Sequence, residues 1–139
     1  KCCDGGFIDI SMTAWAFASV GLPDNALFGQ LATATIGRRA ELPPQTLSNV
    51  AWAFAKGRVK NEQLFSALAD RTVECSREFD RQGVSNTLWA FASVNHARED
   101  VFASLTAYTV ESCLWRKFTP QMASNVLWAC SRAGITDVP

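Results

Sequence analysis

The chain has 139 residues, of which 48% are hydrophobic, and its 13 basic residues balance its 13 acidic residues. This length suits one domain, and the apolar content is sufficient for a hydrophobic core. The sequence contains no run of 18 apolar residues that could form a membrane-spanning helix. The zero net charge argues against the clearly basic surface that is typical of nucleic-acid-binding proteins, although segregated basic groups could still bind a polyanion.

The expected elements follow a period that is marked by the tripeptide Trp-Ala-Phe. Its tryptophans, separated by 37, 37 and 39 residues, are Trp15, Trp52, Trp89 and Trp128. Five further columns keep this period: Ser11, Ser48, Ser85 and Ser124; Asn49, Asn86 and Asn125; Phe28, Phe65 and Phe102; Leu31, Leu68 and Leu105; and Thr35, Thr72 and Thr109. A fixed period of this length is typical of a helical-repeat array.

The period divides the chain into three repeats and a half repeat. Residues 1–7 would be an N-terminal tail or the end of a preceding repeat, and the repeats would span 8–44, 45–81, 82–120 and 121–139. We therefore predict an all-α fold, a right-handed or open α-solenoid of about 3.5 helix-turn-helix repeats of roughly 37 residues. An array that stops mid-repeat would expose an apolar face, so we expect a piece of a longer protein or a mature chain.

Turn and capping signals divide each repeat into two helices. In the second repeat, Pro43-Pro44 marks the start of a helix that runs to Ala55. The turn at Gly57–Lys60 ends it, and Asn61 is a suitable cap for the next helix. We expect the equivalent turns at 21–24 and at 94–97. The third repeat is two residues longer, and its insertion falls near 113–117, after the second helix.

The repeated tryptophans have two interpretations. Burial between stacked hairpins is the favoured one, since an indole ring contributes a large apolar area. The alternative is that they stack on the bases of a ligand. Cys75 and Cys130 lie at core-type helix positions, where we expect them to act as small buried hydrophobic residues.

Neither metal binding nor catalysis is expected. The five cysteines form no C-x-x-C pair and His96 is the single histidine, so we predict no metal site, no cofactor and a reducing compartment. The sequence contains no glycine-rich phosphate loop and no nucleophile motif. We therefore predict a protein that is not an enzyme and that has no small-molecule substrate.

One strip of each first helix avoids the apolar face. In the second repeat it contains Thr46, Asn49, Ala53 and Lys56. A central alanine would leave room for a ligand, and an asparagine amide can read a base edge. The candidate RNA-binding residues of this strip are Asn49, Asn86, Asn125, Lys56 and Arg132. Alternatively, the asparagines bond to the backbone of neighbouring helices as a ladder, or are simply solvated. The serine column would pack or bond back to its own helix.

Basic pairs recur near the end of each second helix. They are Arg38 and Arg39, Arg77 and Arg81, and Arg116 and Lys117. Stacked repeats would align them into a stripe that suits phosphates. Equally, cations favour helix C-termini without any ligand. A third cluster, Lys56, Arg58 and Lys60, occurs in one turn only, which indicates a solvated turn or a local partner contact.

The repeated motif Gln-x-x-Ser-Asn-x-x-Trp-Ala-Phe-Ala, at Gln45–Ala55 and Gln82–Ala92, resembles the octotricopeptide repeats of algal organelle proteins. The 37-residue step is similar to the heptatricopeptide repeats of apicomplexan parasites. The resemblance implies a chloroplast or mitochondrial protein that binds single-stranded RNA in transcript processing, stability, translation or ribosome assembly. The alternative is a scaffold subunit that contacts neighbouring proteins of a ribosome, photosystem or respiratory complex.

Overall fold

The computed structural model describes residues 12–16 and 25–135, and every regular element in these ranges is helical. Residues 12–16 are helical and precede six α-helices of 13 residues each: α2 (Asn25–Gly37), α3 (Pro44–Lys56), α4 (Glu62–Glu74), α5 (Arg81–Ser93), α6 (Glu99–Glu111) and α7 (Pro120–Arg132). Short 3-10 helices follow the second helices: η1 (Arg39–Glu41), η2 (Ser76–Glu78) and η3 (Leu114–Lys117). The predicted all-α class is confirmed. The turn expected at 21–24, together with Ser11, Cys2 and Cys3, lies outside the described residues.

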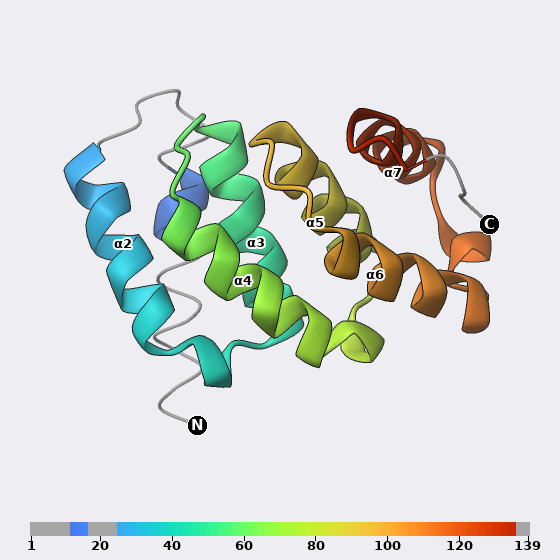
Figure 1. Ribbon diagram of the computed structural model, residues 1–139, viewed down its shortest axis with the longest axis horizontal. Coiled ribbons are helices and arrows are strands. Elements are labelled where there is room, and N and C mark those ends of the chain that lie inside the picture. The colour runs from blue at the N-terminus through green and yellow to red at the C-terminus, as the bar shows by residue number, and fades with distance from the viewer. Residues whose placement is uncertain (1–11, 17–24, 136–139) are drawn as a thin grey trace.

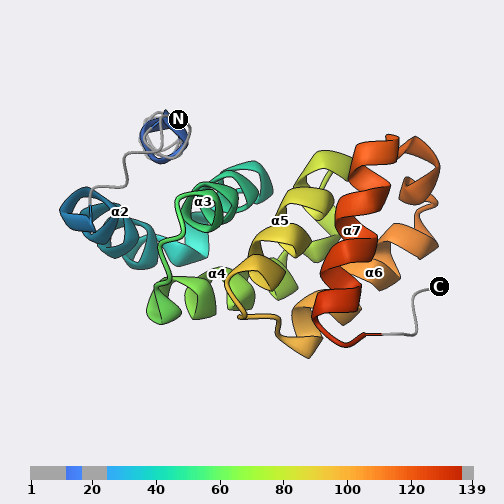
Figure 2. The same cartoon turned by 90° about the horizontal axis from the view of Figure 1, so that it is seen from above.

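The helices form two layers that stack in chain order (Figure 1). Helices α3, α5 and α7 lie side by side in one layer, and α2, α4 and α6 form the other, as the view from above shows (Figure 2). Each hairpin contacts the next through both layers, and the array extends along one axis. This arrangement is that of an α-solenoid. No helix among the described residues is long and apolar enough to cross a membrane.

Local capping fixes where the helices start. Asn61, Asp80 and Thr119 each accept a hydrogen bond from a backbone N–H three residues later, at 3.0, 2.7 and 3.2 Å. These bonds satisfy donors that a helix start leaves without an intrahelical partner. The predicted start at Pro44 and the predicted cap at Asn61 are confirmed.

The ends of the first helices share one turn geometry. Arg58, Asn95 and Gly134 occupy the same column and all have a positive φ, of 59°, 56° and 76°. The next backbone N–H in each turn donates to a carbonyl oxygen five residues earlier, at 2.9 Å in all three. This is the Schellman motif that closes an α-helix. The turn therefore presents Arg58 at a fixed position beyond the end of α3.

Phenylalanines join one hairpin to the next. Phe28 of α2 packs edge-to-face on Phe54 of α3, with ring centroids 4.8 Å apart, and Phe65 of α4 packs in the same way on Phe91 of α5, at 5.3 Å. All four side chains are fully buried. Within each second helix, the repeated threonine bonds to the backbone of the repeated leucine four residues earlier. The hydroxyls of Thr35, Thr72 and Thr109 donate to the carbonyl oxygens of Leu31, Leu68 and Leu105 at 2.7 Å.

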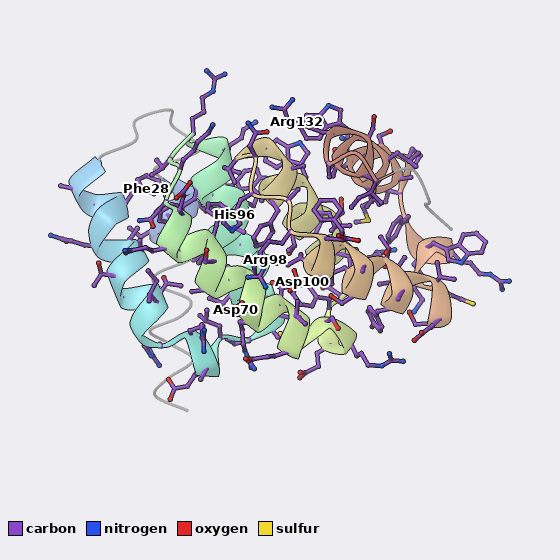
Figure 3. The ribbon with its side chains drawn as sticks, viewed as in Figure 1. Phe28, Asp70, His96, Arg98, Asp100 and Arg132 are labelled. Carbon is purple, nitrogen blue, oxygen red and sulfur yellow. The ribbon has the colours of Figure 1, made fainter. Side chains whose placement is uncertain are left out.

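One carboxylate ties three successive hairpins together. Asp70 of α4 pairs with Arg39 at 3.2 Å and with Arg98 at 2.8 Å. Arg98 also binds Asp100 at 2.6 Å, and these three side chains lie together where α4 and α6 run side by side (Figure 3). The hydrogen bond from Arg98 holds the pKa of Asp100 below its usual range. Because the charged groups are partly exposed, their ion pairs contribute little to the stability of the fold. We infer that the cluster mainly sets the relative position of the hairpins.

The tryptophans are less buried than predicted. Trp15 and Trp128 are 49% and 44% exposed, whereas Trp52 and Trp89 are half-buried against the core. Tryptophan and phenylalanine are two residues apart in the motif, which separates them by about 200° around a helix. Since Phe54 and Phe91 point between the layers, the indole rings must lie toward the outer side. The prediction of buried packing is therefore wrong for Trp15 and Trp128.

The cysteine prediction is confirmed. Cys75 and Cys130 are buried, and burial raises the pKa of both thiols, to about 11 for Cys75. Cys113 is exposed, with a left-handed backbone at the two-residue insertion of the third repeat. Cys130 stands where the three earlier repeats have Phe17, Phe54 and Phe91. Helix α7 therefore lacks the aromatic ring that Phe54 and Phe91 supply to α3 and α5.

Candidate nucleic-acid interface

Each first helix presents a row of polar, aromatic and basic side chains on one face. The members lie at positions i, i+3 and i+7, a spacing that brings side chains to the same side of a helix. The rows are Asn49, Trp52 and Lys56 on α3; Asn86, Trp89 and Ser93 on α5; and Asn125, Trp128 and Arg132 on α7. None of these nine side chains is buried. The asparagine column and the tryptophan column are therefore neighbours on the same surface.

The rows end in a hollow of about 630 Å³ at the C-terminal ends of α3, α5 and α7. We call it the basic-aromatic groove. It is lined by Lys56, Arg58, Lys60, Trp89, Trp128 and Arg132, together with Ala55, Ser93 and Val94. Four of these residues are cationic and none is acidic. A chain with no net charge thus gathers positive charge on one side of its first-helix layer.

Arg132 is held in place from two directions. Its guanidinium carbon lies 5.6 Å from the centre of the Trp128 ring, within the range of a cation–π contact. Its Nε donates to the carbonyl oxygen of Ala92 at 3.2 Å, and an Nη donates to the side-chain oxygen of Asn95 at 3.3 Å. Arg132 therefore reaches from α7 to the C-terminus of α5, between the two helices (Figure 3). There it also offsets the negative end of the α5 dipole.

The two tryptophans of the groove lie next to each other. The ring centroids of Trp89 and Trp128 are 6.4 Å apart, and their planes are inclined by 33°. Trp89 is half-buried and anchored against the core, whereas Trp128 is more exposed. An exposed indole face beside cationic groups can stack on a planar ligand while the cations bind its anionic groups.

Sequence reasoning found only part of this groove. It proposed Lys56 and Arg132, but it interpreted Arg58 and Lys60 as a solvated turn or local contact and the tryptophans mainly as core. The signal available in the sequence was the four-residue step from tryptophan to the next basic position, in Trp52 to Lys56 and Trp128 to Arg132. The step predicts adjacency within one helix. It does not predict that a turn of α3 and the end of α7 line one hollow.

The asparagines are half-buried, and two of them bond within their own helix. The side-chain oxygens of Asn86 and Asn125 accept hydrogen bonds from Gln82 and Gln121 at 2.8 and 3.0 Å. These two side chains therefore do not form the ladder to neighbouring backbones that was one alternative. The serine column is only partly as expected. The buried Ser48 hydroxyl bonds back to the carbonyl oxygen of Gln45 at 3.0 Å, whereas the buried Ser85 hydroxyl donates across to the carbonyl oxygen of Met122 in α7 at 3.5 Å, and Ser124 is exposed.

The alanine of the strip is not an open position. Ala53, Ala90 and Ala129 are fully buried, and Thr46 is buried as well. The prediction that a central alanine leaves room for a ligand is therefore wrong for these three repeats, whereas Ala16 of the first repeat is exposed. The first helices pack side by side along the array, and a small side chain allows them to approach closely. The space that alanine provides is occupied by the neighbouring helix.

The chain is similar to one family of known proteins. The family model of the RNA-editing substrate-binding complex 6 protein matches residues 5–138. The chain belongs to this family. No curated protein matches the chain. The match supports the broader expectation of an RNA-associated helical family and does not name the octotricopeptide or heptatricopeptide families.

The basic pairs of this family member lie at the opposite edge of the layer from the groove. They lie in the 3-10 helices or close to them, near the start of each first helix. This is about 20 Å from the end of that helix, since a 13-residue helix is about that long. Arg38 pairs with Glu41 at 3.4 Å, Arg39 with Asp70 at 3.2 Å and Arg77 with Glu111 at 2.9 Å.

Arg81 and Arg116, two further residues of the basic pairs, also have contacts within the chain. Arg81 donates to the carbonyl oxygen of Lys117 at 2.8 Å, and Arg116 lies over the Trp115 ring at 5.5 Å. Several of these contacts join one hairpin to the next. Phosphate binding by the stripe stays a prediction.

The single histidine and the possible metal ligands are the remaining polar features of the described residues. His96 packs beside the touching rings of Phe65 and Phe91, with both centroid distances at 6.1 Å. Within residues 12–16 and 25–135, no three histidine, cysteine or acidic side chains are grouped so that they could hold a metal ion.

Proposed function

We propose that the chain is a non-catalytic, RNA-binding helical module of an organellar RNA-editing complex. Single-stranded RNA would lie along the rows of α3, α5 and α7, with the basic-aromatic groove as its principal contact. The observation that carries the proposal is the grouping of four cations with Trp89 and Trp128 in one hollow. The family match supports the RNA-editing context, and the resemblance to organellar repeats supports the compartment.

The chemistry of the groove suits a single strand. Lysine and arginine neutralise phosphates, while an exposed indole stacks on bases of any sequence, a combination that recurs in single-strand-binding proteins. A duplex hides its base faces and could not use Trp128. The neutral total charge is no obstacle, because the field near a surface depends on how its charges are distributed.

The asparagine column would add base contacts to this platform. Asn86 and Asn125 use their oxygens in bonds to glutamine, which leaves their NH₂ groups to donate to a base acceptor. Asn49 would act in the same way on α3. We assign Arg39, Arg77 and Arg81 to contacts between hairpins and Arg38 to its local ion pair with Glu41. Arg116 and Lys117 would lie at the outer margin of the RNA path.

The charge contribution is tested with two matched triple variants. Binding of a labelled single-stranded RNA pool is measured by fluorescence anisotropy at several salt concentrations. Changing Lys56, Arg58 and Lys60 to Gln should weaken binding and lower the slope of log affinity against log salt by about 2, since each phosphate contact on a single strand contributes about 0.7. The control changes Arg77, Arg116 and Lys117 to Gln and should alter the slope less. A larger loss in the control would place the RNA at the opposite edge.

The stacking contribution is tested with two exposed tryptophans. Trp128 is 44% exposed inside the groove, and Trp115 is 52% exposed outside it. Trp128→Ala should weaken RNA binding by roughly 5- to 150-fold, because stacking on one base contributes about 1–3 kcal/mol. Trp115→Ala should leave the affinity unchanged. Equal effects of the two changes would contradict a stacking role for the groove.

A further inference from the structure

Three cations of the basic-aromatic groove come from one turn. Lys56 ends α3, Arg58 has the left-handed backbone of the Schellman turn, and Lys60 follows two residues later. The equivalent positions of the next repeat, at 93, 95 and 97, are serine, asparagine and alanine. A strand of RNA that runs along the array meets one repeat after another, so a periodic row of cations would match its phosphates. The positive charge of the groove is instead concentrated in one repeat.

These three cations have no acidic partner among the described residues. The ion pairs of residues 12–16 and 25–135 engage five arginines, and all five lie outside the groove. Lys56, Arg58 and Lys60 are exposed and take part in none of these pairs. Acidic side chains thus neutralise arginines elsewhere in the chain, and the cations of the groove are left to a ligand.

The neighbouring helix ends offset only part of this charge. Each C-terminus of an α-helix carries roughly half a negative charge. The ends of α3, α5 and α7 together therefore balance fewer than two of the four cations that line the groove. An excess of about two positive charges remains. This excess is larger than one phosphate inside an RNA strand requires, since such a phosphate carries a single negative charge.

Arg58 occupies a backbone position that favours other residue types. Its φ is 59°, and the equivalent residues of the later repeats are Asn95 and Gly134, the types that adopt this left-handed conformation most readily. Arginine is less stable there, because its Cβ comes close to the following carbonyl oxygen. Strained backbone of this kind is concentrated at binding sites. The arginine therefore weakens the turn slightly and places a guanidinium group in the groove.

We propose that the basic-aromatic groove binds the terminal phosphate of a single-stranded RNA, a phosphate monoester at its 5′ or 3′ end, with Arg58 as the principal ligand. This inference rests on the RNA binding proposed above and adds which part of the RNA occupies the groove. A monoester carries nearly two negative charges at neutral pH and has three oxygens that accept hydrogen bonds. It thus matches both the excess charge and its concentration in one repeat.

The size and the aromatic lining of the groove agree with a terminal nucleotide. Hollows of about 300–1,000 Å³ hold small ligands, and the volume here is about 630 Å³. The terminal base stacks on the exposed ring of Trp128, while its phosphate lies toward the turn of Arg58. The guanidinium group can bind two phosphate oxygens at once, which a lysine cannot.

The test compares three forms of one oligoribonucleotide with an internal fluorophore. The first has hydroxyls at both ends, the second a 5′ phosphate and the third a 3′ phosphate. Fluorescence anisotropy measures the affinity of each for the full chain at one salt concentration. We expect one phosphorylated form to bind on the order of tenfold tighter than the hydroxyl form, the effect of one added charge-assisted hydrogen bond. A tenfold excess of adenosine 5′-monophosphate should not displace the RNA.

Arg58→Gly separates binding from stability. It should abolish the gain in affinity from the terminal phosphate and still raise the midpoint of thermal unfolding, because glycine adopts a left-handed backbone without strain. Arg58→Asn, which introduces the residue of the equivalent turn, is the second variant and should act in the same direction. Arg77→Gln is the control, since it removes an exposed arginine charge at the opposite edge of the layer, and it should keep the gain.

The outcomes distinguish this inference from the proposed RNA binding. Equal affinity of the three RNA forms would overturn the inference and leave RNA binding intact. A gain that persists in both Arg58 variants would place the terminal phosphate elsewhere and would also overturn it. Displacement by adenosine 5′-monophosphate would identify a free nucleotide as the ligand in place of an RNA end. If none of the three forms binds, the RNA-binding proposal itself fails, and the inference fails with it.

Discussion

Two junctions of this molecule are built from equivalent residues and differ in what covers them. At the interior junction, α6 lies over α4 and α5, and Leu88 and Phe79 are buried. At the C-terminal junction, Leu127 of α7 and Phe118, which follows η3, occupy the same columns and are accessible to solvent. The repeat pattern specifies which side chains are apolar. Burial depends on a neighbouring helix, so equivalent leucines can be buried in one repeat and exposed in another.

The largest expected effect separates the two leucines. Leu88→Ala should lower the free energy of unfolding by about 2–5 kcal/mol, because it removes buried atoms and leaves a cavity. Leu127→Ala should change it by less than about 0.5 kcal/mol, as is usual for an exposed position. Urea unfolding followed by circular dichroism measures both. Similar losses would mean that the C-terminal junction is already covered in solution.

A smaller effect concerns the backbone contact of the interior junction. Tyr108→Phe removes the hydroxyl that donates to the Phe79 carbonyl oxygen and keeps the ring. We expect a loss of about 0.5–1.5 kcal/mol in the free energy of unfolding, the usual contribution of one hydrogen bond. Trp115→Phe at the exposed C-terminal junction is the control and should have little effect. An unchanged stability of Tyr108→Phe would contradict the role assigned to this bond.

The smallest effect depends on pH and compares Cys75 with Cys113. Burial raises the pKa of Cys75 to about 11, so the folded protein keeps a proton that the unfolded chain releases near pH 9. The contribution of this thiol to the free energy of unfolding is therefore constant well below pH 9 and falls as the pH rises from 9 to 11. At pH 9 the free energy of unfolding has already fallen by on the order of 0.5 kcal/mol. Cys75→Ala should flatten the fall in stability between pH 8 and 10. Cys113→Ser, at an exposed site, should not.

The repeat architecture was readable from the sequence because its signals are local. Pro44 and Asn61 mark helix starts through their own backbone and side-chain chemistry, and the threonine and leucine columns bond within one helical turn. The orientation of tryptophan was not read correctly, since Trp52 and Phe54 are both apolar and only packing decides which one faces the core. The buried Ala53 was misread for a similar reason, because its neighbour belongs to another repeat.

The candidate site was only partly predictable for the same reason. Lys56 and Arg132 stand out because each follows a tryptophan by four residues. Arg58 enters the groove through a left-handed turn at the end of α3, and that turn faces α7 across α5. This proximity depends on how far successive hairpins are shifted along the array. The asparagine bonds to Gln82 and Gln121 are local, and the glutamine column of the motif could have indicated them.

The central claim is that RNA follows the groove side of the first-helix layer. The most direct measurement is photocrosslinking of the full chain to single-stranded RNA that contains 4-thiouridine, with the crosslinked peptides identified by mass spectrometry. We expect crosslinks in residues 52–60, at Trp89 and in residues 125–132. Crosslinks confined to the stripe at Arg38, Arg39, Arg77 and Arg116, or an absence of specific crosslinks at low salt, would contradict it.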